Sequence, residues 1–133
     1  LMDIIKSSES VLKLKRIYFK ELNFSREDVE KSNIDVEVEK NQSTDNEYEI
    51  TLNLSIANSE EKYTVNVSIV GVFEFSENAD EVTKNIIIEK NTISILFPYV
   101  RSQVTLLTSQ PDIKPMIIPP LNINNLIKNI NNK

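Results

Sequence analysis

The chain has 133 residues, which is enough for a single domain with one core, and its net charge is -5. This acidic balance excludes nucleic acid or an anionic membrane as the main partner, because phosphate binding depends on clustered Lys and Arg. The chain contains no Cys and no His, which excludes disulfides, thiolate or imidazole catalysis and the usual zinc ligands.

Targeting and membrane segments are not predicted either. The N-terminal region is interrupted by charged residues such as Asp3, Lys6 and Glu9, so it has no apolar core of a signal peptide. No apolar run approaches the roughly 18 residues that a membrane-spanning helix needs. We therefore expect one domain over residues 1–133, cytoplasmic and without membrane insertion.

Two stretches near the N-terminus alternate as strands do. Residues 11–25 carry apolar side chains at both parities, which predicts a strand with both faces partly covered. In residues 33–40, Ile34, Val36 and Val38 share one face and acidic side chains occupy the other. The polar run 41–46 that follows is expected to be a flexible loop.

Two further stretches, residues 47–58 and 63–76, alternate almost without interruption. Short polar loops join all four strands, which predicts an antiparallel meander. Gly71 is the only glycine of the chain and lies inside the fourth strand. Glycine weakens a strand unless a bulge or a close backbone contact requires it, so we expect a bend there.

Residues 79–92 are ambiguous between helix, turn and strand, whereas the next stretch is clearer. From Ile93 the apolar residues recur at helical spacing, which predicts a long packed helix. Pro98 predicts a kink, or a regular helix that begins close to it. The core-facing positions are Ile93, Leu96, Phe97, Val100, Val104 and Leu107.

A second apolar stripe on this helix consists of Ile95, Tyr99 and Leu106. One sheet covers only one side of a helix, and leaving the second stripe in water forgoes about 5 to 9 kcal/mol as an upper estimate. A second copy of the chain is the expected cover; the alternative is that residues 79–90 fold back over the stripe. Arg101 stands among apolar neighbours and is expected to pair with a carboxylate.

The C-terminal part begins with a Pro-rich crossover loop, residues 110–120, whose four prolines enforce an extended path. A short amphipathic helix is predicted to start at Asn122, with Leu121 and Leu126 placed as a hydrophobic staple. Residues 129–133 are expected to form a frayed tail. The predicted fold class is α+β, a four-stranded antiparallel meander sheet with the long helix and this short C-terminal helix packed on it.

No catalytic constellation stands out. Without His or Cys, an enzyme would have to use carboxylates, Lys, Tyr or Ser. The acidic pairs at i, i+2, such as Asp35 with Glu37, lie on the solvated faces of strands, where charged residues are ordinary. A chain with one glycine cannot build a Gly-rich phosphate loop. The sequence therefore favours a non-enzymatic protein without a cofactor or metal.

Five segments, in the same order along nearly the whole chain, resemble the SecB protein-export chaperones. LFPYVR, at residues 96–101, is the most specific part of this resemblance. The five segments are RIYFKELNFS (16–25), YEITLNLSI (48–56), GVF (71–73), ILFPYVRSQVTLLTS (95–109) and PLNINNLI (120–127).

The resemblance implies a tetramer made of two dimers, with the long helices sandwiched between sheets, so Ile95, Tyr99 and Leu106 would lie in an oligomer interface. It also implies a holdase, a chaperone that keeps unfolded polypeptides in apolar grooves without ATP and hands them to the SecA motor in protein export. The groove positions implied are Ile34, Val36, Val38, Ile113, Met116, Ile118, Leu121, Ile123, Leu126 and Ile127.

The acidic positions with which family members dock SecA are matched only in part. Glu21 matches one of them, whereas Ser25 and Asn66 stand at two others. The alternative function is therefore a SecB-like chaperone or binding module dedicated to one partner, such as an antitoxin, without SecA docking.

Overall fold

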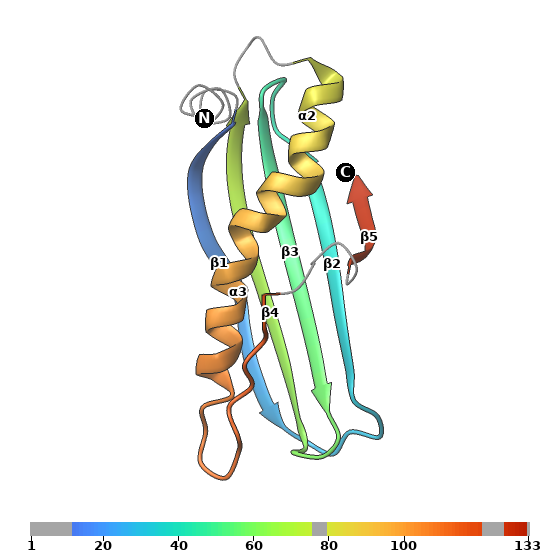
Figure 1. Cartoon of the computed structure of the whole chain (residues 1–133), viewed down its shortest axis with the longest axis vertical. Helices are drawn as coiled ribbons and strands as arrows, with labels where there is room; N and C mark the ends of the chain where they lie inside the picture. Colours follow the sequence, from blue (N-terminus) through green and yellow to red (C-terminus); the bar gives the residue numbers. More distant parts are fainter. Residues whose placement is uncertain (1–11, 76–79, 121–126, 133) are drawn as a thin grey trace.

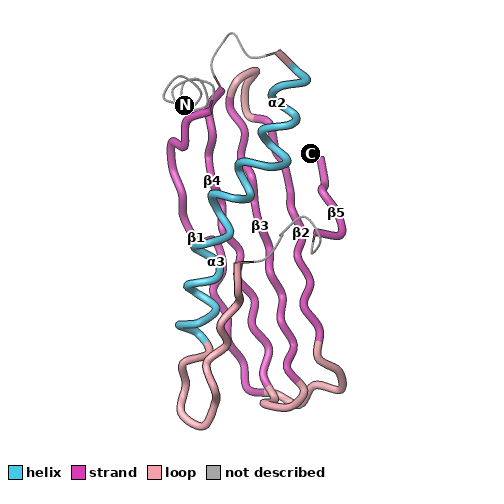
Figure 2. The backbone as a smooth tube through the Cα atoms, in the orientation of Figure 1, coloured by secondary structure: helices cyan, strands magenta, loops and turns pink. Residues whose placement is uncertain are grey.

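The computed structural model describes residues 12–75, 80–120 and 127–132 (Figure 1). Its strands form one sheet, and its helical segments follow one another along a diagonal across one face of that sheet (Figure 2). Within the described ranges no helix has the length and apolar character needed to cross a membrane. The elements are β1 (Leu12–Arg26), β2 (Asn33–Gln42), β3 (Glu47–Asn58), β4 (Tyr63–Phe75), α2 (Glu81–Ile87), the π-helical segment η1 (Ile88–Thr92), α3 (Ile93–Leu107) and β5 (Ile127–Asn132).

The α+β class is confirmed, with four antiparallel strands, one long helix and one short helix. The strand order is β1-β4-β3-β2-β5. β2, β3 and β4 follow one another as hairpins, but β1 lies beside β4 and not beside β2, where a simple meander would have it. Its connection to β2 passes the end of the β3–β4 hairpin, where Glu27 N donates to Lys62 O (3.1 Å) and Ser59 N donates to Ser32 Oγ (2.9 Å).

The helix face of the sheet, which is the face that α3 covers, holds the core. Alternate residues of β3 and β4 meet there across the ladder, as Leu52 does with Ile69, and both side chains are fully buried. From the helix, the buried positions are those that the apolar spacing predicts. They are Ile93, Leu96, Phe97, Val100 and Val104.

The outer face of the sheet, opposite α3, is polar along β3 and along β4 as far as Ser68, whereas farther along β4 it carries the buried Val70 and Val72. Ser55 Oγ donates to Asn66 Oδ1 (2.9 Å), and Ser68 Oγ donates to Asn53 Oδ1. Such cross-strand pairs stabilise a sheet without apolar packing. The two faces of the sheet therefore differ in chemistry as well as in cover.

Gly71 has a structural role that follows from close packing. A Cβ at this position would lie 2.7 Å from Cε2 of Phe73 and 2.8 Å from Cδ2 of Leu96, so only glycine lets α3 approach β4 this closely. The irregularities of the β1–β4 ladder lie in β1, on either side of Ile17, which pairs with Gly71. Of the two reasons for a glycine that the sequence suggested, the close contact therefore applies at Gly71. The bulges lie in the neighbouring strand, β1.

The ambiguous segment is helical and is fastened to the sheet by a buried lysine. Asp80 caps α2 by accepting a hydrogen bond from Thr83 N (2.7 Å), and hydrogen bonds from the Thr83 side chain and from this N–H hold the pKa of the Asp80 carboxyl below its usual value. Lys84 is buried, and its Nζ donates to Asp45 O (3.1 Å) and to Asn46 Oδ1 (3.0 Å) in the β2–β3 turn. These hydrogen bonds offset the cost of removing the Lys84 ammonium group from water.

The π-helical segment changes which side of the helix faces the sheet. In an uninterrupted α-helix, residues seven and eleven positions before Ile93 would share its buried face, and these are Ile86 and Val82. The wider π turn shifts that register, so that Lys84 is buried while Val82 and Ile86 are 69% and 51% exposed. α2 thus continues away from α3 and does not fold back over the second stripe, which removes the alternative left open by the sequence.

The C-terminus differs from the expected helix. Residues 127–132, predicted to belong to a short helix and a frayed tail, form β5, which pairs in parallel with β2. This stretch is rich in asparagine, which is a poor helix former, and β2 is otherwise the edge of the antiparallel sheet. Backbone pairing with that edge accounts for the strand.

We expect the Gly71→Ala variant to lower the free energy of unfolding by about 1–3 kcal/mol, because the added methyl group must displace Phe73 or Leu96. Urea denaturation followed by circular dichroism measures this change. Ser55→Ala, at an exposed position of the adjacent strand, should stay within about 0.5 kcal/mol of the parent. A midpoint for Gly71→Ala equal to or above that of the parent would contradict the close-contact explanation.

Candidate functional site

The apolar row of β2 lies on the helix face of the sheet. Ile34, Val36 and Val38 pair with Ile56, Leu54 and Leu52 of β3. Val36 and Val38 are 1% and 2% exposed, whereas Ile34 is 41% exposed. In the isolated chain, then, only the first of these three predicted groove positions is open to a partner.

The second part of the predicted groove is the strap, residues 113–118, which runs back along α3 (Figure 1). Ile113 and Ile118 are buried, and Met116 is partly buried. Ile117 is 77% exposed, although the resemblance does not point to it. The prolines predict an extended path, and neighbouring side chains in extended backbone point in opposite directions. This alternation could have predicted that Ile117 faces solvent between Met116 and Ile118.

Two side chains of α3 and that of Thr108, which caps the helix, hold the strap by its main chain. Arg101 Nε donates to Ile118 O (2.8 Å), Thr105 Oγ1 donates to Met116 O (2.9 Å), and Met116 N donates to Thr108 Oγ1 (2.8 Å). Within the part of the chain that the structure describes, Arg101 therefore donates to a backbone carbonyl and not to the carboxylate expected from the sequence. The bonds fix the strap while leaving its side chains free to face either the core or solvent.

The start of the strap is anchored as well. The chain turns at Asp112, whose φ is 69°, and Lys114 N then donates to Glu61 Oε2 (3.0 Å) in the β3–β4 turn. The strap is thus tied at one end to the sheet and along its length to the helix. Ile117 is presented to solvent on a fixed backbone.

The remaining predicted groove positions are near the C-terminus. Leu121, Ile123 and Leu126 lie outside the described residues. Ile127 is the first residue of β5 and pairs with Val36. The structure thus joins the last predicted position to the β2 row through backbone pairing.

The second stripe of α3 is exposed over most of its length. Tyr99 and Leu106 are 47% and 63% exposed, whereas Ile95 is partly buried at the margin of the core. Val82 and Ile86 of α2 are also exposed, and the sequence did not single them out. Their i, i+4 spacing could have predicted that they share one side of a helix.

The predicted SecA contact lies on the outer face of the sheet. Glu21 of β1 pairs with Ser68 of β4, and farther along the strand Asn23 pairs with Asn66 and Ser25 with Thr64. Glu21 is exposed. Of the three positions compared with the family, this part of the face therefore offers a single carboxylate.

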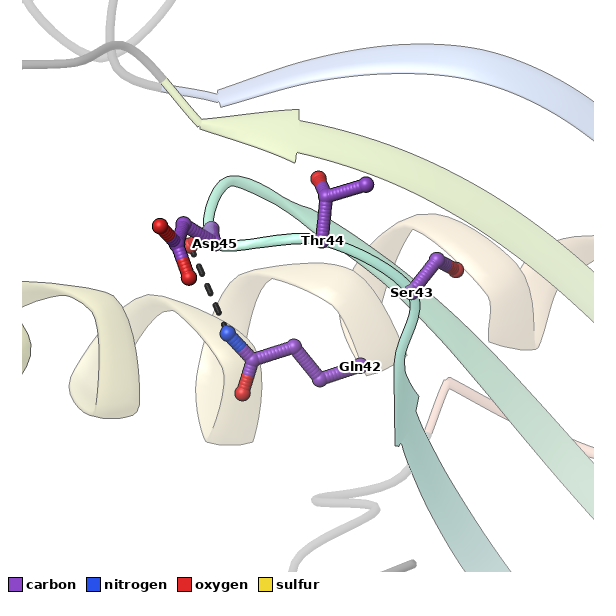
Figure 3. A pocket seen from close by; sticks show the side chains of 4 residues that line it. All are labelled: Gln42, Ser43, Thr44 and Asp45. Carbon is purple, nitrogen blue, oxygen red and sulfur yellow. Dashed lines mark hydrogen bonds between the residues drawn. The ribbon is translucent and has the colours of Figure 1, made fainter.

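Two shallow hollows are polar and lie at turns. One, of about 430 Å³, is lined by residues 42–45 of the β2–β3 turn, where Gln42 Nε2 donates to Asp45 O (3.5 Å; Figure 3). The other, of about 290 Å³, is lined by Arg26, Glu27, Asp28 and Lys62. In the first, Thr44 Oγ1 accepts hydrogen bonds from Asn46 N and Glu47 N, and in the second Lys62 lies 3.8 Å from Asp28, so these polar groups serve the turns. In the described ranges, no group of three or more carboxylates is arranged to hold a metal ion.

Ionisable groups elsewhere are placed for structure. Burial raises the pKa of the Tyr48 hydroxyl, and the carboxylates of Glu81 and Asp45 raise it further, so this group stays protonated. The hydrogen bond to Glu47 raises the pKa of Lys15, which forms an exposed ion pair across the strands (2.7 Å). Neither perturbation creates an acid or a base suited to catalysis near neutral pH.

Comparison with known proteins identifies the family. The sequence profile described as preprotein translocase subunit SecB matches residues 6–133. The protein-export protein SecB of Orientia tsutsugamushi strain Boryong is 26% identical over 140 aligned positions, covering 95% of this chain and 87% of that protein. An uncharacterized protein of Methanocaldococcus jannaschii is 32% identical over 103 positions, which cover 74% of this chain but only 65% of that relative's length.

Two solved structures share the fold. A SecB-like chaperone of Mycobacterium tuberculosis, in complex with a ChAD peptide from the HigA1 antitoxin, superposes with a TM-score of 0.65 at 15% identity, covering 90% of this chain and 98% of that one. A protein of unknown function from Streptococcus agalactiae superposes with a TM-score of 0.51 at 9% identity, covering 83% and 97% of the two chains. At these identities the likeness concerns the fold.

The strap is expected to loosen in a Thr108→Val variant. This change keeps the shape of a fully buried side chain but leaves Met116 N without its acceptor, which costs about 1–3 kcal/mol. Hydrogen exchange at the Met116 amide should become faster, and the midpoint of urea unfolding should fall. Ser109→Ala removes a neighbouring exposed hydroxyl that bonds within the helix and should change neither quantity. Unchanged protection of Met116 in Thr108→Val would show that the strap does not depend on this bond.

Proposed function

The chain belongs to the SecB family, and from that membership we propose that it is an ATP-independent holdase that binds unfolded polypeptides on apolar surface of its helix side. It works without catalysis and without a cofactor. The observation that carries the proposal is Ile117, a large apolar side chain that is 77% exposed on a backbone held by hydrogen bonds at both neighbouring residues. Together with the exposed Ile34, Tyr99 and Leu106, it gives the helix side several large apolar side chains in water, and such exposure serves binding more readily than folding.

The energetics suit many weak contacts. Burying one isoleucine side chain against a client gains about 1.5–3 kcal/mol, which alone gives only weak binding. An unfolded client offers many apolar side chains, and contacts at Ile34, at the strap and at copies of both in an oligomer add through effective concentration. Met116, partly buried beside Ile117, has an adaptable side chain that fits clients of different sequence.

A dedicated partner is the second candidate function. The Mycobacterium tuberculosis relative in fold is bound to a peptide of an antitoxin, and the outer face here presents Glu21 without acids at Ser25 and Asn66. Both observations favour a role in which the chain protects one specific partner and does not dock SecA. Affinity capture from the source cell distinguishes the two, since a holdase yields many unfolded clients and a dedicated module yields one protein in fixed stoichiometry.

Self-association forms part of the proposal. The exposed Tyr99 and Leu106 lie seven residues apart on one side of α3, and Ile95 continues that line toward the core. A second copy covers this stripe, and two such dimers form the tetramer that the family resemblance implies. We propose a cytoplasmic location for this assembly.

Replacing the exposed Ile34 and Ile117 should weaken client binding without unfolding the chain. The Ile34→Lys/Ile117→Lys variant introduces charges at side chains that are 41% and 77% exposed, so the fold tolerates them. We expect the parent to suppress aggregation of a chemically unfolded client and the variant to lose at least about tenfold in potency, since about 1.4 kcal/mol changes binding tenfold. Light scattering during dilution of the client measures this.

The matched control is Asn23→Lys/Ser55→Lys, which adds the same charge at exposed positions on the outer face. It should suppress aggregation as the parent does. If both double variants retain full activity, or if the parent has none, the proposed holdase site is wrong.

Charges in the second stripe should break the oligomer. Sedimentation equilibrium of the Tyr99→Lys/Leu106→Lys variant is expected to give the mass of one chain, because each lysine would have to lose its hydration in the interface. The parent and the Asn23→Lys/Ser55→Lys control should sediment as a dimer or a tetramer. A parent that remains a single chain at micromolar concentration would overturn the assignment of this stripe.

A further inference from the structure

β5 occupies the edge of the strand that carries the apolar row of the candidate site. It pairs in parallel with the middle of β2, from Val36 with Ile127 to Lys40 with Asn132 (Figure 2). Among the described residues, this pairing begins at Val36. The start of β2, with the exposed Ile34, lies outside it.

The pairing of β5 with β2 is short and interrupted. A register shift follows directly after its first pair, between Val36 and Glu37, whereas β2 and β3 pair without interruption over the whole of β2. The positions of β5 in register with Glu37 and Glu39 are asparagines, a residue type depleted in strands. A short, interrupted parallel strand of this composition is a weak competitor for the edge.

The β2 edge offers what an extended peptide needs. Its backbone groups form a ladder with whichever strand lies beside them, so a peptide can add to it by strand addition. Ile34 supplies an open apolar contact next to the point where β5 begins. A peptide that first contacts Ile34 can pair along β2 and remove β5 stepwise.

We propose that β5 and an extended client segment compete for the edge of β2, so that the C-terminal strand closes this edge in the free protein and leaves it when a client binds. The inference rests on the proposed function, because it concerns how the same surface is opened. β5 covers no catalytic or metal group. Its effect is to lower the apparent affinity for clients by the fraction of time during which the edge is closed.

A disulfide between Lys40→Cys and Asn132→Cys tests the competition. These residues are register partners, and the chain has no other cysteine, so oxidation locks β5 onto β2 and reduction releases it in the same protein. The probe is a fluorescent peptide of alternating isoleucine and lysine, and its affinity is measured by fluorescence anisotropy. We expect binding to be at least about tenfold weaker in the oxidised than in the reduced state. The two single-cysteine variants should not respond to oxidation.

The opposite change opens the edge. Ile130→Pro with Asn131→Pro removes the amide hydrogens of two adjacent residues of β5, one of which must face β2, and should raise the affinity for the probe by about tenfold. The matched control, Ile130→Ala with Asn131→Ala, keeps both amides and should raise it far less. The same peptide with alternate amides methylated cannot complete a ladder and should not bind any variant.

The outcomes separate this inference from the proposed function. Equal affinity in the oxidised and reduced states, or no peptide binding in either, would overturn the competition at the edge. Aggregation suppression by the parent is assayed independently. If the parent suppresses aggregation but the oxidised and reduced states bind the peptide equally, only the competition at the edge is wrong. If the parent does not suppress aggregation, the holdase proposal itself is wrong.

Discussion

The close approach of α3 to β4 at Gly71 is the contact on which the rest of the structure depends. Because no Cβ stands between them, Leu96 and Phe73 pack against the glycine, and both are fully buried. This contact lets the helix lie close to the sheet at its middle strands. The line of Arg101, Thr105 and Thr108 then lies where it can hold the strap, and the strap in turn fixes which of its residues face the solvent.

A single helix on a single sheet leaves two surfaces uncovered, and their chemistry separates the partners that each can take. Where β3 and β4 carry hydrogen-bonded pairs such as Ser55 with Asn66, contact with the outer face of the sheet is made through polar groups. The helix side exposes Tyr99, Leu106 and Ile117, which gain free energy when another apolar surface removes them from water. A partner that docks on the sheet and a client held at the helix side need not compete.

The sequence predicted those parts of the fold that follow from local periodicity. Alternation over residues 47–58 and helical spacing from Ile93 each describe one element packed on one face, and both elements form as predicted. The position of β1 beside β4 could not be predicted, because a strand that is apolar on both faces carries no signal that selects its neighbour. The helix predicted from Asn122 depended on isoleucine and leucine spacing alone, whereas in β5 the partner is the backbone of β2, which leaves no trace in side-chain pattern.

The candidate site was predictable only in outline. Val36 and Val38 were placed on the correct face of their strand, but pattern alone cannot distinguish a buried residue from one that lines an open groove. Ile117 became visible only when the path of the strap was known. Arg101 shows the same limit, since a sequence suggests charged partners for an arginine more readily than it suggests a carbonyl oxygen.

The way in which the strap is held has a consequence for how this protein can diverge. Its anchors are the main-chain N–H and C=O of residue 116 and the C=O of residue 118, atoms whose presence does not depend on the side chain there unless residue 116 becomes proline. The side chain at position 117 can therefore be exchanged over generations while the scaffold stays intact. Selection for different clients could therefore change this one residue without changing the backbone that holds it.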